Sequence, residues 1–466
     1  MPIPILPETF VCLLSAFAGC FTAPSYRNFE AVVAGWVHCL GRRTVTAVAL
    51  AAGIVGERHI SVCHRFFGRA VWTLDTVGQV LFGLAAAWVP ADQRLYVLVD
   101  DTLARKGGKR ISLAAMHHDP LRSTAKKPFF SFGHVWVVAA LWVPLPMGGA
   151  RGFALPILVR LYAGRKRGGQ ADAPSRPGSA QRRTAAVDAS DPVVGPTKRE
   201  LAREMVGLLA SWAGDRPVYA VADSLYAGRT FLDDRPANVH VVTRLRMDAA
   251  LWAPPPPRQP GEKGRPRRRG ARLPSPQALA DARQHWHRLP VTLYGRAVTT
   301  QVFRRTALWY AAVPGALVRI VVVRDPAGYR KDEAFVCTDP TATVAFVLEA
   351  FARRWSLEVS FHDAKQSLGF EDPPSQTTLA VRRTAPLALL VYGLVVLWYA
   401  GQVRDGRAVP WPHRPWYPRK TTPSFADMLA ALRRQGWRRY VYRPPSRQRR
   451  LSKSAIPWPD AVLATA

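Results

Sequence analysis

The chain has 466 residues, of which 48% are hydrophobic, so it can bury a sizeable core and global disorder is excluded. Its 65 Lys and Arg residues outnumber 32 Asp and Glu residues, and the formal net charge of +33 indicates a polyanionic partner, nucleic acid or an anionic membrane surface, rather than a merely soluble basic protein. The five cysteines contain no Cys-x-x-Cys pair, which excludes a disulfide framework and a zinc site of that spacing.

Residues 1–90 have mostly helical patterns and are predicted to form a helical DNA-binding region. Residues 9–24 resemble the apolar core of a signal peptide. However, the segment before them contains Glu8 and no Lys or Arg, whereas a signal peptide begins with a positively charged region. We therefore expect a cytoplasmic, nucleoid-associated protein. Two apolar-periodic stretches within residues 44–72 are separated by glycines. This pattern is compatible with a helix-turn-helix, but any two short helices joined by glycine produce it, so DNA contact by this region stays open.

A catalytic domain of strands and helices is predicted over residues 91–375. The buried-strand run LYVLVD ends in acid at Asp100, followed by Asp101, and the run VYAVADS reaches Asp223. Groups at the carboxyl ends of strands face the functional edge of an α/β sheet, where an Asp costs stability unless it is paired or binds a metal. For either acid alone, a turn-initiating Asp is the simpler interpretation.

Further strands, helices and loops are expected within this domain. The polar stretch 164–184, rich in Arg, Gly and Pro, cannot build a core and is expected to be a mobile loop. A β-rich insertion is expected at about residues 247–340. Strands are expected at 111–116, 134–143, 154–162 and 239–246, and helices at 197–214 and from near Thr341.

Two groups of basic residues are candidate DNA contacts. Arg105 and Lys106 follow the first acid, and they either grip DNA or belong to a solvated hairpin tip. Arg267, Arg268 and Arg269 lie in a proline-broken basic segment of the insertion, which is either a loop lying on phosphates or a flexible linker.

A charged helix near the end of the domain has the sequence FARRWSLEVSFHDAKQSLGF. At about 100° per residue, Arg354, Glu358 and Lys365 share one narrow face, whereas Asp363 falls on the opposite side. Arg354 and Glu358 alone would make an ordinary i,i+4 pair, but Lys365 is too distant to join it. A line of basic, acidic and basic groups fits a carboxylate that holds a divalent ion between cations that hold phosphates.

Three acids from distant positions, Asp100, Asp223 and Glu358, can converge on two metal ions about 4 Å apart. Such a site activates water or a 3′-hydroxyl and stabilises the leaving oxygen, which is the chemistry of phosphodiester cleavage and strand transfer. The segment MHHDP at 116–120 is expected to form a hairpin turn rather than a metal site, because adjacent side chains of an extended segment diverge.

Residues 376–466 are predicted to form a helical and basic C-terminal region. The apolar run 385–400 is shorter than the roughly 20 residues that span a bilayer. It also follows Arg382 and Arg383, so we expect a buried core helix rather than a membrane segment. A further helix is expected at 424–437.

The three acidic motifs together resemble those of bacterial insertion-sequence transposases of the DDE type. The charged helix matches the Y-x2-R-x3-E-x6-K signature of that family at Arg354, Glu358 and Lys365, with Phe351 in place of Tyr. LYVLVDDT resembles the strand that carries the first Asp, and VYAVADSLYAG resembles the strand that carries the second. The resemblance covers about residues 30–375, and it is the combination of motifs that makes it specific.

This resemblance implies an RNase H-like α/β core with a β-strand insertion between the second Asp and the Glu. It implies cut-and-paste transposition of DNA by a homodimer on paired transposon ends, with two Mg2+ ions per active site, or Mn2+ as a substitute. Asp100, Asp223 and Glu358 would be the catalytic metal ligands. Arg354 and Lys365 would contact the DNA backbone near the cleaved end.

Some positions depart from the family pattern or leave it open. The family's D-x-[ST] pattern favours Asp100 over Asp101 as the first acid, and only one of two successive strand residues can face the site. The Tyr hydroxyl that is missing here would have bonded a phosphate. Trp252 and Trp309 are the candidates for an aromatic residue that stacks on a flipped base. A DNA-binding regulator that no longer transposes and a basic membrane-associated protein are the alternative functions.

Overall fold

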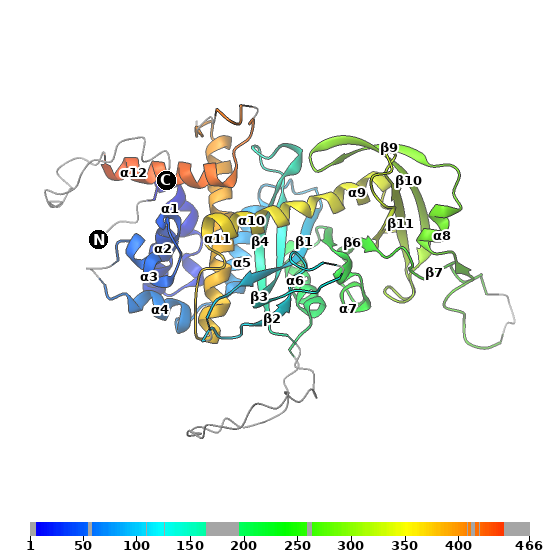
Figure 1. Ribbon diagram of the computed structural model, residues 1–466, viewed down its shortest axis with the longest axis horizontal. Helices are drawn as coiled ribbons and strands as arrows, with labels where there is room; N and C mark the ends of the chain where they lie inside the picture. Colours follow the sequence, from blue (N-terminus) through cyan, green and yellow to red (C-terminus); the bar gives the residue numbers. More distant parts are fainter. Residues whose placement is uncertain are drawn as a thin grey trace, which may run out of the picture.

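Three parts follow one another along the longest axis of the molecule (Figure 1). N-terminal helices lie together with the C-terminal helices at one end, a mixed sheet with helices lies in the centre, and the strands of the insertion lie at the other end. Most of the expected loop at 164–184 lies outside the described residues. The computed structural model describes residues 6–441, except 55–57, 109, 125, 165–194, 259–262, 408, 412–414 and 419.

The N-terminal part is helical over its described length. Thr44 and Thr73 accept hydrogen bonds from backbone amides in the first turns of α3 and α5, which satisfies donors that a helix start leaves free. The helices of residues 44–72 are therefore two short ones, and their role in DNA contact stays a prediction. The bounds are α1 Glu8–Ser15, α2 Ala23–His38, α3 Val45–Ala51, α4 Ser61–Gly68 and α5 Leu74–Ala86, with a short 3-10 helix at Ala18–Cys20.

Five strands at the centre of the sheet have the order β4-β3-β1-β5-β6. β1 is antiparallel to β3 and β3 to β4, whereas β1 is parallel to β5 and β5 to β6. This mixed α/β arrangement, with α5, α6, α10 and α11 packed on the strands, is compatible with an RNase H-like fold. The bounds are β1 Leu95–Arg105, β3 Phe130–Val143, β4 Phe153–Tyr162, α6 Lys198–Ala213, β5 Val218–Ala222, η3 Ser224–Tyr226, α7 Arg229–Leu232 and β6 Val239–Leu245.

The insertion continues the same sheet rather than forming a separate one. β12 pairs antiparallel with β6, and β11 and β10 follow outward. The insertion is therefore joined to the central strands by backbone hydrogen bonds. The bounds are β7 Leu251–Trp252, β8 Arg272–Leu273, α8 Pro276–Asp281, β9 His287–Leu293, β10 Arg296–Leu308, β11 Leu317–Arg324 and β12 Glu333–Cys337.

The strand expected at 111–116 was placed too early. The structure has β2 at Ala115–His118, because Leu113 adopts a left-handed backbone conformation with φ of 61° and interrupts the extended chain. β2 pairs with the beginning of β3, and the chain between them turns after Asp119. Met116, His117 and His118 therefore belong to β2, and only Asp119 and Pro120 of the segment MHHDP enter the hairpin connection.

The helix expected from near Thr341 is two helices. Thr343 caps the first by accepting a hydrogen bond from the backbone N–H of Phe346, so the helix begins after it. Arg354 then interrupts the helix, and Gly369 closes the second helix in a left-handed conformation with φ of 59°. The bounds are α9 Val344–Arg353 and α10 Trp355–Leu368.

The apolar run expected at 385–400 lies in α11 (Thr378–Arg404). By length and composition this helix is able to cross a membrane, but 94% of its most apolar window is buried within the protein. Phe10 of α1 and Trp398 make an edge-to-face contact at 6.4 Å, and α12 (Phe425–Val441) packs on the same helix. The core-helix interpretation therefore accounts for the apolar sequence.

Arg383 joins α11 to the N-terminal helices through backbone carbonyls. Its guanidinium donates to the carbonyl oxygens of Ala70 at 2.9 Å and Phe67 at 3.3 Å, and to that of Trp72, whose ring it also covers at 4.3 Å. Arg383 is 6% exposed, so these acceptors replace its hydration. The N-terminal helices are thus fixed to the central sheet through α11.

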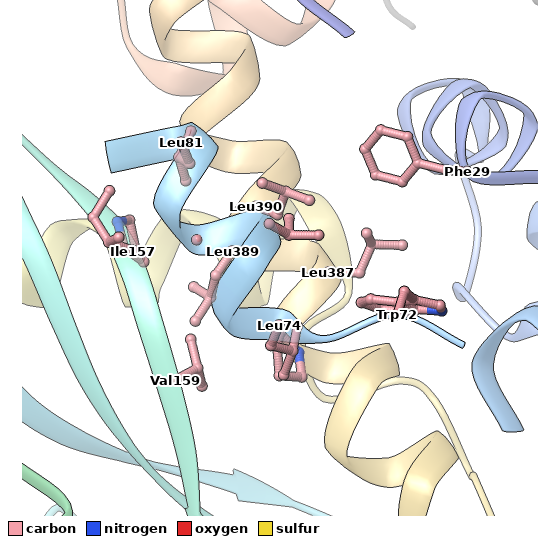
Figure 2. A pocket seen from close by; sticks show the side chains of 13 residues that line it. Phe29, Trp72, Leu74, Leu81, Ile157, Val159, Leu387, Leu389 and Leu390 are labelled. Atoms are coloured by element: carbon pink, nitrogen blue, oxygen red, sulfur yellow. The ribbon is translucent and has the colours of Figure 1, made fainter. Parts of the chain in front are cut away.

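A small apolar cavity of about 20 Å³ lies where α5, β4 and α11 meet (Figure 2). It is lined by apolar side chains that include Leu74, Leu81, Val159 and Leu390. A cavity of this size holds at most a single water, and its lining offers no side-chain partner for one. It is a packing gap rather than a ligand site.

Candidate active site

Asp100 and Asp223 lie at the same level of two adjacent parallel strands. In the register of β1 and β5, Val99 faces Ala222, and the two acids are the next residues on their strands. Asp223 ends its strand and accepts a hydrogen bond from the backbone N–H of Ser224. Asp223 therefore follows the end of β5, as predicted, whereas Asp100 lies in the middle of β1, which continues to Arg105. The prediction that the first strand ends at its acid was wrong, because β1 extends beyond its parallel pairing with β5 and continues along β3.

The carboxylate of Asp100 forms an ion pair with the guanidinium Nη1 of Arg354 and accepts the backbone N–H of Asp101 at 2.9 Å. Its side chain is only 16% exposed. Burial raises the pKa of Asp100 to about 7, although the neighbouring positive charge of Arg354 opposes this rise. A buried carboxylate of this kind requires a cation beside it to stay ionised.

Asp101 has different partners. Its carboxylate pairs with Lys198 Nζ at 2.6 Å and accepts the hydroxyl of Tyr226 at 3.2 Å. Tyr226 is fully buried, and burial followed by the charge of Asp101 raises its pKa well above the usual range. Because Asp101 is satisfied by α6 and η3, its contacts favour Asp100 as the first acid of the site.

Arg354 bridges two of the predicted acids. Its Nη2 contacts Glu358 Oε1 at 2.7 Å, while Nη1 contacts Asp100. Burial lowers the pKa of Arg354, but the charges of Asp100, Glu358 and then Asp223 outweigh it and raise that pKa. The i,i+4 pair expected on the helix is present, and it is one half of a bridge between α10 and β1.

Lys365 lies on the same side of α10 but is bonded within the protein. Its Nζ donates to the carbonyl of Leu103 at 2.7 Å and lies 3.5 Å from Glu371 Oε1. Lys106 Nζ donates to the carbonyls of Glu371 at 2.6 Å and Pro373 at 3.2 Å, and burial lowers the pKa of Lys106 to about 8. These contacts tie the end of β1 to the chain after α10.

Arg105 belongs to the same junction. Its side chain pairs with Asp119 at 3.0 Å, and its backbone N–H donates to Glu371 Oε1 at 3.1 Å. The sequence did not indicate Glu371 as a partner, because it lies three residues after the end of α10 and matches no motif. It meets three basic residues that the sequence proposed for DNA contact.

Arg267, Arg268 and Arg269 are exposed in the insertion. Arg269 places its guanidinium 3.9 Å from the ring centre of Trp252 and 5.2 Å from that of Tyr310. Trp309 is 9% exposed and belongs to the core. Of the two tryptophans proposed for base stacking, Trp309 is therefore buried and Trp252 is covered on one face by an arginine.

A row of aromatic rings crosses the sheet beneath α9. Trp142, Tyr96, Tyr219 and His240 face one another on the adjacent strands β3, β1, β5 and β6. Arg353 lies over this row, 3.8 Å from the ring centre of Tyr96 and 4.3 Å from that of Trp142. It thus anchors the end of α9 immediately before Arg354, a role that no sequence pattern indicated.

Phe351, which replaces the Tyr of the signature, packs within the protein. Its ring centre is 4.8 Å from that of Phe335 and 5.6 Å from the guanidinium carbon of Arg354. The aromatic body of the residue therefore still contacts Arg354 without the hydroxyl.

The chemistry of the acids suits a hard divalent cation, because carboxylate oxygens are its preferred ligands. Within the described ranges, no three His, Cys, Asp or Glu side chains are already grouped closely enough to hold a metal ion. Asp100 and Glu358 instead share the positive charge of Arg354. The carboxylates of Asp100 and Glu358 are suited to bind a cation, and in this structure the guanidinium of Arg354 is the positive charge between them.

Comparison with known proteins identifies one family. The family model described as DDE superfamily endonuclease matches residues 16–310, which contain Asp100 and Asp223, while Glu358 lies beyond the match. No curated protein matches the chain. Since the match covers more than half of the 466 residues, the chain belongs to the DDE superfamily endonuclease family.

Proposed function

We propose that the chain is a DNA transposase of the cut-and-paste type, which cleaves phosphodiester bonds at the ends of an insertion sequence and joins them to target DNA. The observation that carries this proposal is that two of the predicted acids share one positively charged side chain, Arg354. Asp100 from β1 and Glu358 from α10 meet at Arg354, and Asp223 lies level with Asp100 on the neighbouring strand. Membership of the endonuclease family supports phosphodiester cleavage.

Endonucleases of this superfamily generally use divalent metal ions. In this proposal Asp100, Asp223 and Glu358 hold Mg2+, or Mn2+ as a substitute, with two ions per site. Bound metal would supply activation of a water or 3′-hydroxyl and stabilisation of the leaving oxygen. The protein contributes a buried carboxylate at Asp100. The strand β1 on either side of it is paired with β3, which keeps the acid at a fixed position.

Arg354 is the residue best placed to hold a DNA phosphate beside the acids. Its Nη1 and Nη2 are paired with Asp100 and Glu358, so the guanidinium fork would be released for a phosphate once those carboxylates hold a metal ion. Arg267, Arg268 and Arg269 are proposed to hold DNA farther away, from the insertion. For Lys365, Lys106 and Arg105, DNA contact requires exchange of the protein acceptors described above.

The test uses DNA taken from both sides of the gene, with cleavage measured in Mg2+ and in Mn2+. Glu358→Gln removes one acid and is expected to abolish cleavage while leaving DNA binding intact. Asp363→Asn is the matched control, because it changes an acid five residues along the same helix that contacts His362 instead of Arg354. Full cleavage by Glu358→Gln would show that the site is wrongly assigned.

The same assay separates the regulatory alternative. Binding of the flanking DNA without metal-dependent cleavage by the unaltered chain would favour a DNA-binding regulator. Paired ends also imply a homodimer on DNA, which sedimentation of the protein with flanking duplexes would detect as two chains per complex.

A further inference from the structure

Four large apolar side chains are exposed on the β2–β3 hairpin, defined here as residues 115–133, of which all but 125 are described. Leu121 is 87% exposed, Met116 60%, Phe130 52% and Phe129 36%. Burying a side chain of this size is worth about 1.5–3 kcal/mol, so such a group on one hairpin indicates a surface that a partner covers.

The hairpin is held from inside. Asp119, which is 2% exposed, accepts the hydroxyl of Ser131 at 2.7 Å and pairs with Arg105 at 3.0 Å. Ser123 Oγ donates to the carbonyl of Asp119 at 2.8 Å and accepts the backbone N–H of Phe129 at 2.8 Å. These hydrogen bonds and the ion pair hold the turn in one conformation, so the exposed apolar side chains have fixed positions on the hairpin.

The exposed charge of the hairpin is positive, which favours a negatively charged partner. Arg122, Lys126 and Lys127 are exposed, whereas its one acid, Asp119, is buried and paired. Arg122 also lies over the ring of Phe129 at 4.5 Å. Apolar side chains beside basic ones are a combination that grips duplex DNA, the apolar ones packing in the minor groove and the basic ones meeting phosphates. A second copy of this chain would bring its own net charge of +33, and like charges oppose that contact.

The register places the hairpin relative to the acids. Val138 faces Asp100, and Phe130 lies eight residues earlier on β3, past the end of β1, where Arg105 faces Gly133. At about 3.4 Å per residue the separation along the strand is roughly 27 Å. Duplex DNA rises by about 3.4 Å per base pair, so roughly eight base pairs span this length.

We propose that the β2–β3 hairpin is a second DNA-contact surface, which grips the duplex roughly eight base pairs from the bond that lies at Asp100. Lys126 and Lys127 meet phosphates, and Leu121 and Phe130 pack on sugars and bases. The inference rests on the proposed function in taking DNA as the substrate. In the strand order of the sheet, β2 and the insertion lie on opposite sides of β1 and β5, so the two basic surfaces lie on either side of the strands that carry the acids.

The experiment measures binding to a 30-base-pair mixed-sequence duplex in EDTA, so that cleavage plays no part. The double variant Leu121→Ser with Phe130→Ser is expected to weaken binding about tenfold without changing its salt dependence. Lys126→Gln with Lys127→Gln is expected to lower the slope of log affinity against log salt by roughly 2, since each lost phosphate contact removes about 0.9. Val403→Ser is the matched control, because Val403 is an apolar residue of α11 that is 37% exposed and lies outside the regions proposed to contact DNA.

Position is tested by photocrosslinking. Replacement of Leu121 by p-benzoylphenylalanine is expected to crosslink to the duplex, and the same replacement at Val403 is not. Unchanged affinity and slope in both double variants, or equal crosslinking at both positions, would overturn the proposal. A dimer in the absence of DNA that the Leu121 and Phe130 variant loses would also overturn it, because the partner would then be a second copy.

The outcome is separable from that of the proposed function. If the chain cleaves no DNA but crosslinks through Leu121, the surface stands and the transposase proposal fails. If Glu358→Gln abolishes cleavage while the hairpin variants bind like the unaltered chain, the site stands and the hairpin proposal fails.

Discussion

Basic residues at the end of β1 and basic residues of the insertion have opposite surroundings. Lys106 and Lys365 donate to backbone carbonyls and have lowered pKa values because they are buried. Arg267, Arg268 and Arg269 are exposed, and the first two have no protein partner among the contacts of the described residues. The basic residues therefore form two groups. The inner population, Lys106 and Lys365, holds the fold together near the site, whereas the outer population, Arg267, Arg268 and Arg269, is exposed and available for DNA contact.

The largest effect is expected from the acids at the junction itself. Asp100→Asn should lower metal-dependent cleavage by at least about 10³-fold, because it removes a proposed metal ligand and the partner of Arg354. Asp101→Asn on the next residue should leave a much larger residual rate, since Asp101 contacts Lys198 and Tyr226. Equal losses in the two variants would show that both neighbours take part in the reaction.

The inner population is tested by stability. Lys106→Met leaves the carbonyls of Glu371 and Pro373 without their donor, and we expect the free energy of unfolding to fall by about 2–3 kcal/mol. Chemical denaturation would measure this fall. A variant that unfolds like the unaltered chain but binds DNA more weakly would instead place Lys106 with the DNA contacts.

The outer population is tested by salt. Replacing Arg267, Arg268 and Arg269 by Ser should weaken DNA binding about tenfold and lower the slope of log affinity against log salt by up to roughly 2.7. The free energy of unfolding should change by less than about 0.5 kcal/mol, because these side chains are exposed. A large loss of stability would contradict the division into two populations.

The smallest effect concerns Arg353, a basic residue of neither population. Arg353→Met removes the stacking on Tyr96 and Trp142 and should lower the cleavage rate about three- to tenfold by loosening the junction that carries Arg354. Arg94→Met removes a similar stack on Tyr219 and Phe346, away from that junction, and should leave the rate unchanged. Matching losses in both variants would indicate a general effect on the sheet.

Several elements of the site were predictable because their signals are local. Apolar runs that end in acid identified the strands of Asp100 and Asp223, and the spacing of Arg354 and Glu358 identified their pairing. The interruption at Arg354 was not predictable, because the apolar periodicity continues through it. Likewise, β2 begins late because Leu113 takes a left-handed conformation, which favours glycine and which no residue type announced.

The sequence by itself determined the strands that carry Asp100 and Asp223 and the excess of positive charge, since these depend on residue type and on spacing along one element. The tertiary structure decided which charges meet. Arg354 bridges α10 and β1, Asp101 is satisfied by α6, and Glu371 engages residues more than 250 positions earlier in the chain. Partners so distant in sequence are brought together by packing, and periodicity carries no information about them.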